Sequence, residues 1–260
     1  MATTRRKYAW LAALLALAVG LYAAWTIAAR SADRQPLALM TSLPIYWGEG
    51  SDMGELIAGR VDTPFVRQVL ERQYELEMLD TLAAQPGVGD EAATIDPLAG
   101  VTRLFIVQPR GLGPEDNVAL DKWVRAGGKL LLALDPQLTN TYAVTISDPR
   151  HPTSAALIPP VMQRWGLAMR YDEEQTFGQR TVTVDGMDWP VVLAGELFAV
   201  GAEGDEGRGK CSIEADGVIA RCSVGAGQVT VLADAAMFEQ VGAEGMGEDE
   251  MLTLLRTAFD

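Results

Sequence analysis

The sequence predicts an α/β domain with a mostly parallel sheet flanked by helices, extended by antiparallel strands and preceded by one transmembrane helix. Three observations lead to this fold class. An uncharged apolar run occupies residues 8–29, short apolar strands then alternate with helical patterns, and residues 180–225 change to short strands separated by turns. Near-continuous apolar strands that alternate with helices are typical of a parallel sheet covered on both faces.

The start of the chain predicts a membrane anchor. A helix over residues 8–29 extends about 33 Å, which is enough to cross the hydrocarbon layer. Arg5, Arg6 and Lys7 precede this run and only Arg30 directly follows it, which favours a cytoplasmic N-terminus. The alternative is a cleaved signal peptide, but the apolar core of such a peptide is usually about 7–15 residues long, and no clear Ala-x-Ala site follows.

This topology divides the chain into four parts. We expect residues 1–7 to form a cytoplasmic tail, residues 8–29 the anchor, residues 30–36 a linker, and residues 37–260 a domain on the periplasmic side of a bacterial inner membrane. Without residues 1–30 the chain has 17 basic and 35 acidic residues, a formal charge of −18. A domain with this charge repels nucleic acid and anionic lipid headgroups, so we expect no nucleic-acid partner.

The elements of the first part follow from local signals. Residues 37–46 form an apolar run typical of a buried strand. A capping residue and a proline in Asp62-Thr63-Pro64 predict the start of a helix. Apolar and acidic residues alternate over 74–79, which predicts a half-buried strand, and residues 83–100 are expected to be a loop because they are rich in Gly, Pro and Asp.

The clearest unit is a strand over 103–108, a helix over 114–126 and a strand over 129–134. Gly127-Gly128 ends the helix between these strands. A further helix is expected over 153–165, before a strand at 167–171.

The last part of the chain is predicted to extend and close the sheet. An antiparallel extension over 180–225 contains the turn Asp185-Gly186. A buried strand at 228–233 and an amphipathic helix at 249–259 follow.

The two cysteines lie on either side of a hairpin turn signal. Counting outward from Asp216-Gly217 pairs Cys211 with Cys222, so the two sulfur atoms should face each other. In an oxidising compartment this predicts a disulfide. A regular hairpin of this register places the pair at a hydrogen-bonded site, where the strands are farther apart than a disulfide prefers, so two reduced cysteines remain the alternative.

No complete catalytic, nucleotide-binding or metal-binding motif occurs. Gly111-Leu112-Gly113 lacks the third glycine of a dinucleotide loop and precedes two acidic residues, which favours a turn and a helix cap. No phosphate-binding loop accompanies the strand that ends at Asp135. His151, the only histidine, lies in a proline-flanked loop, and neither Gly-x-Ser-x-Gly nor HExxH is present. We therefore expect no catalytic residue, metal or cofactor, and predict that the protein is not an enzyme.

Polar and aromatic side chains gather where the predicted parallel strands end. Ligands of open parallel sheets bind beyond the carboxyl ends of the strands. The residues expected there as candidates for a carbohydrate or peptide site are Ser42, Tyr46, Trp47, Gln108, Asp135 and Asp234. The alternative is that Asp135 and Asp234 only cap turns, and that Tyr46 and Trp47 form a partner surface or a buried corner.

Several segments resemble the GldG-type auxiliary proteins of ABC transport systems. One is the region from Leu104 to Pro136, which contains Leu120-Asp-Lys-Trp-Val-Arg-Ala-Gly-Gly-Lys129 before a buried strand. Another is Gly225-Ala-Gly-Gln-Val-Thr-Val-Leu-Ala-Asp234, which is similar to the final strand of that family, and residues 39–47 match its first strand. The resemblance covers most of residues 37–259. It implies a class I glutamine-amidotransferase-like, flavodoxin-like fold without the amidotransferase Cys–His pair.

Together these observations predict a non-enzymatic accessory component of an ABC-type transport complex or another inner-membrane complex. It would act through contacts with integral-membrane transporter or envelope subunits. The alternative is an extracytoplasmic module that binds carbohydrate or peptide in the strand-end cleft.

Overall fold

The computed structural model of the chain describes residues 34–48, 54, 63–87, 93–201, 207–239 and 247–260. The predicted tail, the predicted anchor at 8–29 and the first part of the linker lie outside these residues. Within the described ranges, no helix is both long and apolar enough to cross a bilayer.

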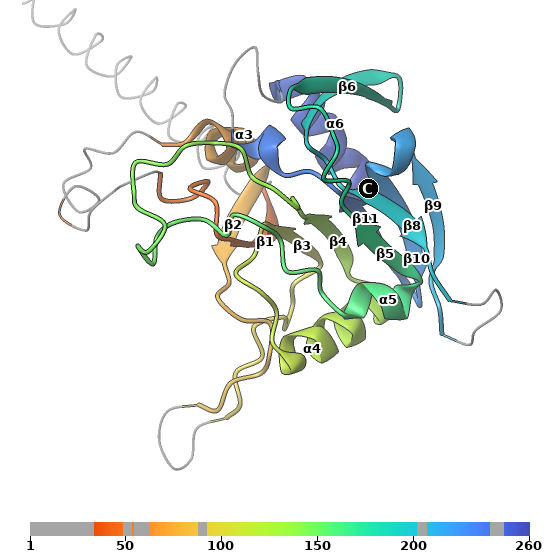
Figure 1. Cartoon of the computed structure of the whole chain (residues 1–260). Coiled ribbons are helices and arrows are strands. Elements are labelled where there is room, and N and C mark those ends of the chain that lie inside the picture. The colour runs from red at the N-terminus through yellow and green to blue at the C-terminus, as the bar shows by residue number, and fades with distance from the viewer. Residues whose placement is uncertain (1–33, 49–53, 55–62, 88–92, 202–206, 240–246) are drawn as a thin grey trace, which may run out of the picture.

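A seven-stranded sheet forms the centre of the domain, in the order β2-β1-β3-β4-β11-β10-β9 (Figure 1). Its parallel strands are β1 (Gln35–Thr41), β2 (Tyr74–Met78), β3 (Arg103–Val107), β4 (Lys129–Ala133) and β11 (Gly227–Leu232). The antiparallel strands β10 (Ile219–Val224) and β9 (Lys210–Glu214) continue it. The prediction of a mostly parallel sheet with an antiparallel extension is confirmed.

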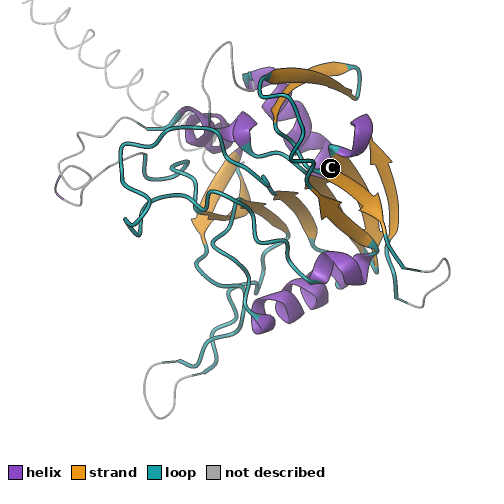
Figure 2. Ribbon diagram, viewed as in Figure 1, coloured by secondary structure: helices purple, strands orange, loops and turns teal. Residues whose placement is uncertain are grey.

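Helices cover both faces of the sheet (Figure 2). One face packs against α3 (Phe65–Gln73) and α6 (Glu248–Phe259), and the other against α4 (Pro114–Arg125) and α5 (Val161–Trp165). Strand β1 contributes Leu37 and Leu39 to the first core and Ala38 and Met40 to the second. Because successive side chains of a strand point to opposite faces, burial on both faces explains the continuous apolar run.

Two small sheets complete the domain. Strands β5 (Leu167–Arg170) and β8 (Glu196–Ala199) form one, and β6 (Gln179–Val184) and β7 (Met187–Val192) form the other. Asp185 and Gly186 join β6 to β7 with φ angles of 52° and 79°, as their turn signal predicts. The predicted extension over 180–225 therefore contributes both a separate hairpin and two strands of the main sheet.

Two predicted elements end or begin elsewhere. Strand β1 ends at Thr41, and residues 42–47 form turns, because the Thr41 Oγ1 atom accepts the N–H of Leu43 and Pro44 follows. The helix predicted over 153–165 is confined to Val161–Trp165. Residues 153–156 instead bond to the ends of β1 and β4, and Pro160 is the N-cap of the short helix.

Candidate functional site

The predicted strand-end residues do come together at the carboxyl edge of the parallel strands, but the polar ones are buried. The order of the strands places the switch point between β1 and β3, because the chain leaves β1 towards β2 on one side and continues through β3 on the other. Ser42 follows β1 and Gln108 follows β3 at this point. Gln108, Asp135 and Asp234 are 0 % exposed and Ser42 is 7 % exposed.

Gln108 joins three segments through its side chain. Its Nε2 atom donates to the carbonyl oxygens of Asp135 (3.1 Å) and Thr153 (2.8 Å), and its Oε1 atom accepts the backbone N–H of Asp135 (2.8 Å). Its φ angle is 43°, a left-handed conformation that is uncommon for a residue other than glycine. Both N–H groups of the amide and its oxygen atom are therefore engaged within the protein, and the buried amide has no N–H left to donate to a ligand.

The switch point itself is filled by the chain. The Ser42 Oγ atom donates to the carbonyl oxygen of Gln108 (2.5 Å) and accepts the N–H of Thr153 (3.0 Å). The N–H of Ala156 donates to the carbonyl oxygen of Asp135 (2.8 Å). Residues 153–156 thus lie where a ligand of an open parallel sheet would bind.

Asp135 and Asp234 each hold backbone N–H groups of neighbouring turns. Asp135 accepts the N–H groups of Gln137 (2.7 Å) and Ala235 (3.3 Å), and Asp234 accepts that of Val192 (2.7 Å). Burial raises the pKa of Asp135 to about 6. Burial, and then the charge of Asp135, raise the pKa of Asp234 well above its ordinary value. In this conformation both carboxyl groups cap turns and have no contact with solvent.

Glu239 is a third carboxyl group near this edge that sequence reasoning missed. Neither of its carboxyl oxygens has a hydrogen-bond partner among the described residues, although both are buried. Burial, and then the negative charge of Asp135, raise the pKa of Glu239 to about 8. Glu239 follows Asp234 by five residues without any motif, so only the folded chain reveals the grouping. In the described parts of the chain, no group of three or more His, Cys, Asp or Glu is arranged to hold a metal ion.

Tyr46 and Trp47 are the predicted ligand residues that remain accessible. Their rings meet edge to face with centroids 4.7 Å apart. The guanidinium of Arg67 lies 4.0 Å from the centre of the Tyr46 ring and donates to the Tyr46 carbonyl oxygen (2.9 Å). Arg67 of α3 thus contacts Tyr46, and the neighbouring Trp47 is 55 % exposed.

Further exposed apolar side chains lie on the segment after β4 of the main sheet and on the segment after β5 of a small sheet. Ile146 and Leu157 are 81 % and 61 % exposed in the segment after β4, and Phe177 is 75 % exposed after β5. The hydroxyl of Tyr171 donates to Gln137 Oε1 (2.7 Å), which ties these two segments together. We call Trp47, Ile146, Leu157 and Phe177 the apolar edge residues.

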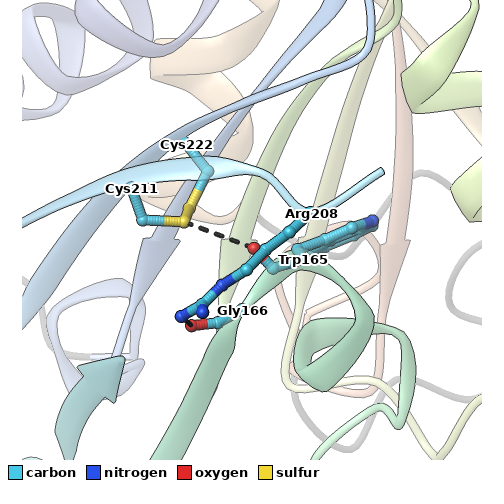
Figure 3. The surroundings of a disulfide bond; sticks show 5 residues. All are labelled: Trp165, Gly166, Arg208, Cys211 and Cys222. Atoms are coloured by element: carbon cyan, nitrogen blue, oxygen red, sulfur yellow. Dashed lines mark hydrogen bonds between the residues drawn. A yellow bond between two sulfur atoms is a disulfide. The ribbon is translucent and has the colours of Figure 1, made fainter. Parts of the chain in front are cut away.

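The predicted pairing of Cys211 with Cys222 is confirmed, and the two residues form a disulfide (Figure 3). Their Cα atoms are 4.0 Å apart, which is close to the spacing of a non-hydrogen-bonded pair rather than the wider spacing expected from a two-residue turn. The turn is wider than predicted, with Ala215, Asp216 and Gly217 all at positive φ. The disulfide joins the edge strand β9 to β10, and the Cys211 sulfur lies 3.7 Å from the Trp165 carbonyl oxygen.

Comparisons with known proteins identify no family for this chain. No family model matches it, and no curated protein matches it. Among solved structures, the exo-β-1,4-mannosidase Op5Man5 from Opitutaceae bacterium strain TAV5 is similar, with 14 % identity, coverage of 86 % of this chain and 33 % of that chain, and a TM-score of 0.41. The GH42 β-galactosidase Gan42B is 11 % identical, with coverage of 86 % of this chain and 30 % of that chain and a TM-score of 0.44. The β-galactosidase from Rahnella sp. R3 is 10 % identical, with coverage of 86 % of this chain and 31 % of that chain and a TM-score of 0.42. The chain spans about a third of the length of these structures.

These matches require one correction. The prediction that the protein is not an enzyme is wrong, because several solved structures that match the chain are glycoside hydrolases. The missing catalytic motifs do not exclude enzymatic activity. At this identity and TM-score the matches assign neither a substrate nor a catalytic residue to the chain.

Proposed function

We propose that the protein is a membrane-anchored accessory component of an ABC-type transport complex or another inner-membrane complex, and that it acts through protein–protein contacts at the carboxyl edge of its sheet. One observation carries this proposal: the apolar edge residues are exposed, whereas the switch point is filled by the chain itself. The switch-point side chains of Ser42 and Gln108 are already bonded within the chain, which favours a protein surface over a small polar ligand. The GldG-like, glutamine-amidotransferase-like interpretation of the sequence supports the same class of function.

The direction of β1 supports a particular orientation. Strand β1 begins at Gln35, inside the predicted linker and six residues after the predicted anchor ends at residue 29, and its direction leads away from the anchor. The starts of the parallel strands would then face the membrane, and the apolar edge residues would face the periplasm or a periplasmic part of a partner. The disulfide agrees with an oxidising compartment.

The alternative carbohydrate- or peptide-binding module has less support. Four of its six expected ligand residues are buried and bonded to the chain: Ser42, Gln108, Asp135 and Asp234. Only Tyr46 and Trp47 remain for a ligand.

Affinity purification of the full chain from detergent-solubilised membranes tests the proposal. We expect stoichiometric recovery of an integral-membrane partner, and loss of that partner in the double variant Trp47→Ser/Phe177→Ser. Removal of a central aromatic anchor weakens an interface by more than about 1 kcal/mol, so two removals should lower affinity by roughly 30-fold or more.

The matched control is Val118→Ser. Val118 is 70 % exposed on α4 and is not one of the apolar edge residues. This variant should retain the partner. Recovery of the bare protein from intact complexes, or equal partner recovery by the double variant, would contradict the proposal.

A further inference from the structure

The amino edge of the sheet, where the five parallel strands begin, is rich in basic side chains. Arg103 and Lys129 are the first residues of β3 and β4 and lie opposite each other in the register. Arg34 precedes β1, Arg72 lies in the last turn of α3 just before β2, and Arg256 lies in the last turn of α6. This concentration is unexpected in a domain with a formal charge of −18 outside the anchor region.

Three of these arginines share one hollow. Arg34, Arg72 and Arg256 line a space of about 610 Å³ together with Gln35, Gln73 and Asp260. A second hollow, about 460 Å³, lies beside it and is also lined by Arg34 and Arg72. Spaces of this size accept small polar groups such as a phosphate ester.

Not every basic side chain at this edge is paired with an acidic side chain. Arg72 pairs with Glu248, and Lys129 Nζ donates to backbone oxygen atoms of Phe259 and Asp260 at 2.7 and 2.8 Å. The Nε atom of Arg103 is buried without a hydrogen-bond partner in the described part of the chain. Arg256 bonds only within its own helix, to the Leu252 carbonyl oxygen and the Thr253 hydroxyl, among the described residues.

The predicted anchor would place this edge at the bilayer surface. Arg34 is five residues after Ala29, the last residue of the predicted span, so the two lie at most about 18 Å apart along an extended chain. Guanidinium groups bind phosphate through parallel N–H donors, and basic clusters beside a membrane helix attract anionic headgroups.

We infer that the amino edge, through Arg34, Arg72 and Arg256, binds the phosphate groups of anionic phospholipids and holds the domain upright on the membrane. This inference rests on the proposed membrane anchoring. It also refines the expectation from net charge, because the repulsion of lipid headgroups expected of the whole domain does not hold at the edge where the basic side chains gather.

Hydrogen–deuterium exchange on the full chain in nanodiscs tests the inference. The nanodiscs contain zwitterionic phosphatidylcholine alone or together with anionic phosphatidylglycerol. We expect slower exchange around residues 34–41, 72–78 and 252–260 only with the anionic lipid, and loss of this protection at high salt. Residues 146–157, at the opposite edge, serve as the internal reference and should not change.

The double variant Arg34→Gln/Arg256→Gln should lose most of this protection, because each charge removed lowers the affinity for the anionic membrane about five-fold. It leaves the pair between Arg72 and Glu248 intact, so the fold should persist. Arg180→Gln is the matched control, because Arg180 is exposed on β6 and pairs in register with Val191, near the carboxyl edge.

Three outcomes would overturn the inference. The first is equal exchange in the two kinds of nanodisc, and the second is unchanged protection in the double variant. The third is that inorganic phosphate produces the same protection in phosphatidylcholine nanodiscs, which would indicate a site for a soluble anion. Failure of the chain to co-elute with nanodiscs would instead overturn the proposed anchoring, and this result is read separately from exchange.

Discussion

Gln108 combines an unfavourable backbone conformation with a side chain that makes three hydrogen bonds within the protein. A left-handed φ at a residue other than glycine costs on the order of 1–3 kcal/mol, and it persists where the surroundings determine it. Here the side chain makes three hydrogen bonds to Asp135 and Thr153. The residue therefore stabilises the closure of the switch point rather than the local backbone.

Truncation of this side chain should destabilise the domain. Gln108→Ala leaves the N–H of Asp135 and the carbonyl oxygen of Thr153 without these partners, so the free energy of unfolding should fall by about 2–4 kcal/mol. Chemical denaturation of the full chain in detergent measures the change. Gln175→Ala, which removes one hydrogen bond to the Ala194 carbonyl oxygen, is the control and should cost about 1 kcal/mol. An equal cost for both variants would contradict this role of Gln108.

The carboxyl group of Glu239 should make stability depend on pH. Its pKa is about 8 in the folded protein against an ordinary value of 4.5, so between these values the folded state holds a proton that the unfolded state has released. Stability must then fall as pH rises from about 4.5 to about 8, and level off above. The raised pKa values of Asp135 and Asp234 act in the same direction.

Glu239→Gln tests this dependence. The variant should equal the natural protein in melting temperature near pH 4 and exceed it near pH 8, by on the order of 1–3 kcal/mol in the free energy of unfolding. Melting curves across this pH range provide the measurement, with Glu173→Gln on an exposed loop as control. A constant difference between variant and natural protein at all pH values would show that Glu239 does not titrate in this way.

At the scale of elements, the disulfide secures the edge of the sheet. Strand β9 pairs only with β10 in the main sheet, and the bond between Cys211 and Cys222 closes a loop with a sequence separation of 11. Closing a loop of this length restricts the unfolded chain and contributes about 2–3 kcal/mol. It also keeps the edge strand attached, which limits pairing with other chains.

The double variant Cys211→Ala/Cys222→Ala should melt about 5–10 °C lower than the natural protein. Dithiothreitol should lower the melting temperature of the natural protein by a similar amount and leave the variant unchanged. Equal melting temperatures for the natural protein with and without reductant would refute this contribution.

The strand–helix–strand unit around α4 shows how elements depend on one another. A Cβ atom at Gly128 would lie 2.5 Å from the Trp123 ring, and one at Gly227 would lie 2.0 Å from the Val124 carbonyl oxygen. The indole N–H of Trp123 donates to the Val101 carbonyl oxygen at 2.8 Å. These glycines therefore allow the end of α4 to pack directly on the starts of β4 and β11.

At the scale of the whole molecule, the two edges of the sheet have different characters. The amino edge carries basic side chains, whereas buried carboxyl groups lie at the carboxyl edge and exposed apolar residues lie on segments that follow strands. This polarity matches the proposed arrangement, with one edge at the bilayer and the other free for a partner. It arises because all parallel strands of a sheet begin at the same edge.

The arrangement predicts the sidedness of the domain. Protease added to spheroplasts should digest residues 37–260, whereas intact cells should protect them. Immunoblotting with antibodies against the domain measures the loss, and a cytoplasmic protein serves as the control for lysis. Survival of the domain in spheroplasts would place it in the cytoplasm and contradict the proposed topology.

Much of the fold was predictable because it depends on local patterns. The helix at Phe65–Gln73, the strand–helix–strand unit and the pairing of Cys211 with Cys222 each follow from signals within a few residues. The helix predicted over 153–165 was mostly wrong, because the hydrogen bonds of residues 153–156 to distant strand ends outweigh local preference.

The sequence alone determined the class of fold, the order of most elements and the disulfide partners, since hydrophobic period and turn residues are local properties. Only the tertiary structure decided what the strand-end residues do. Thr153 reaches Ser42 across 111 residues, and that contact buries Gln108 and closes the switch point. Whether a polar side chain binds a ligand or forms hydrogen bonds within the chain depends on such distant partners, and no local sequence pattern identifies these partners.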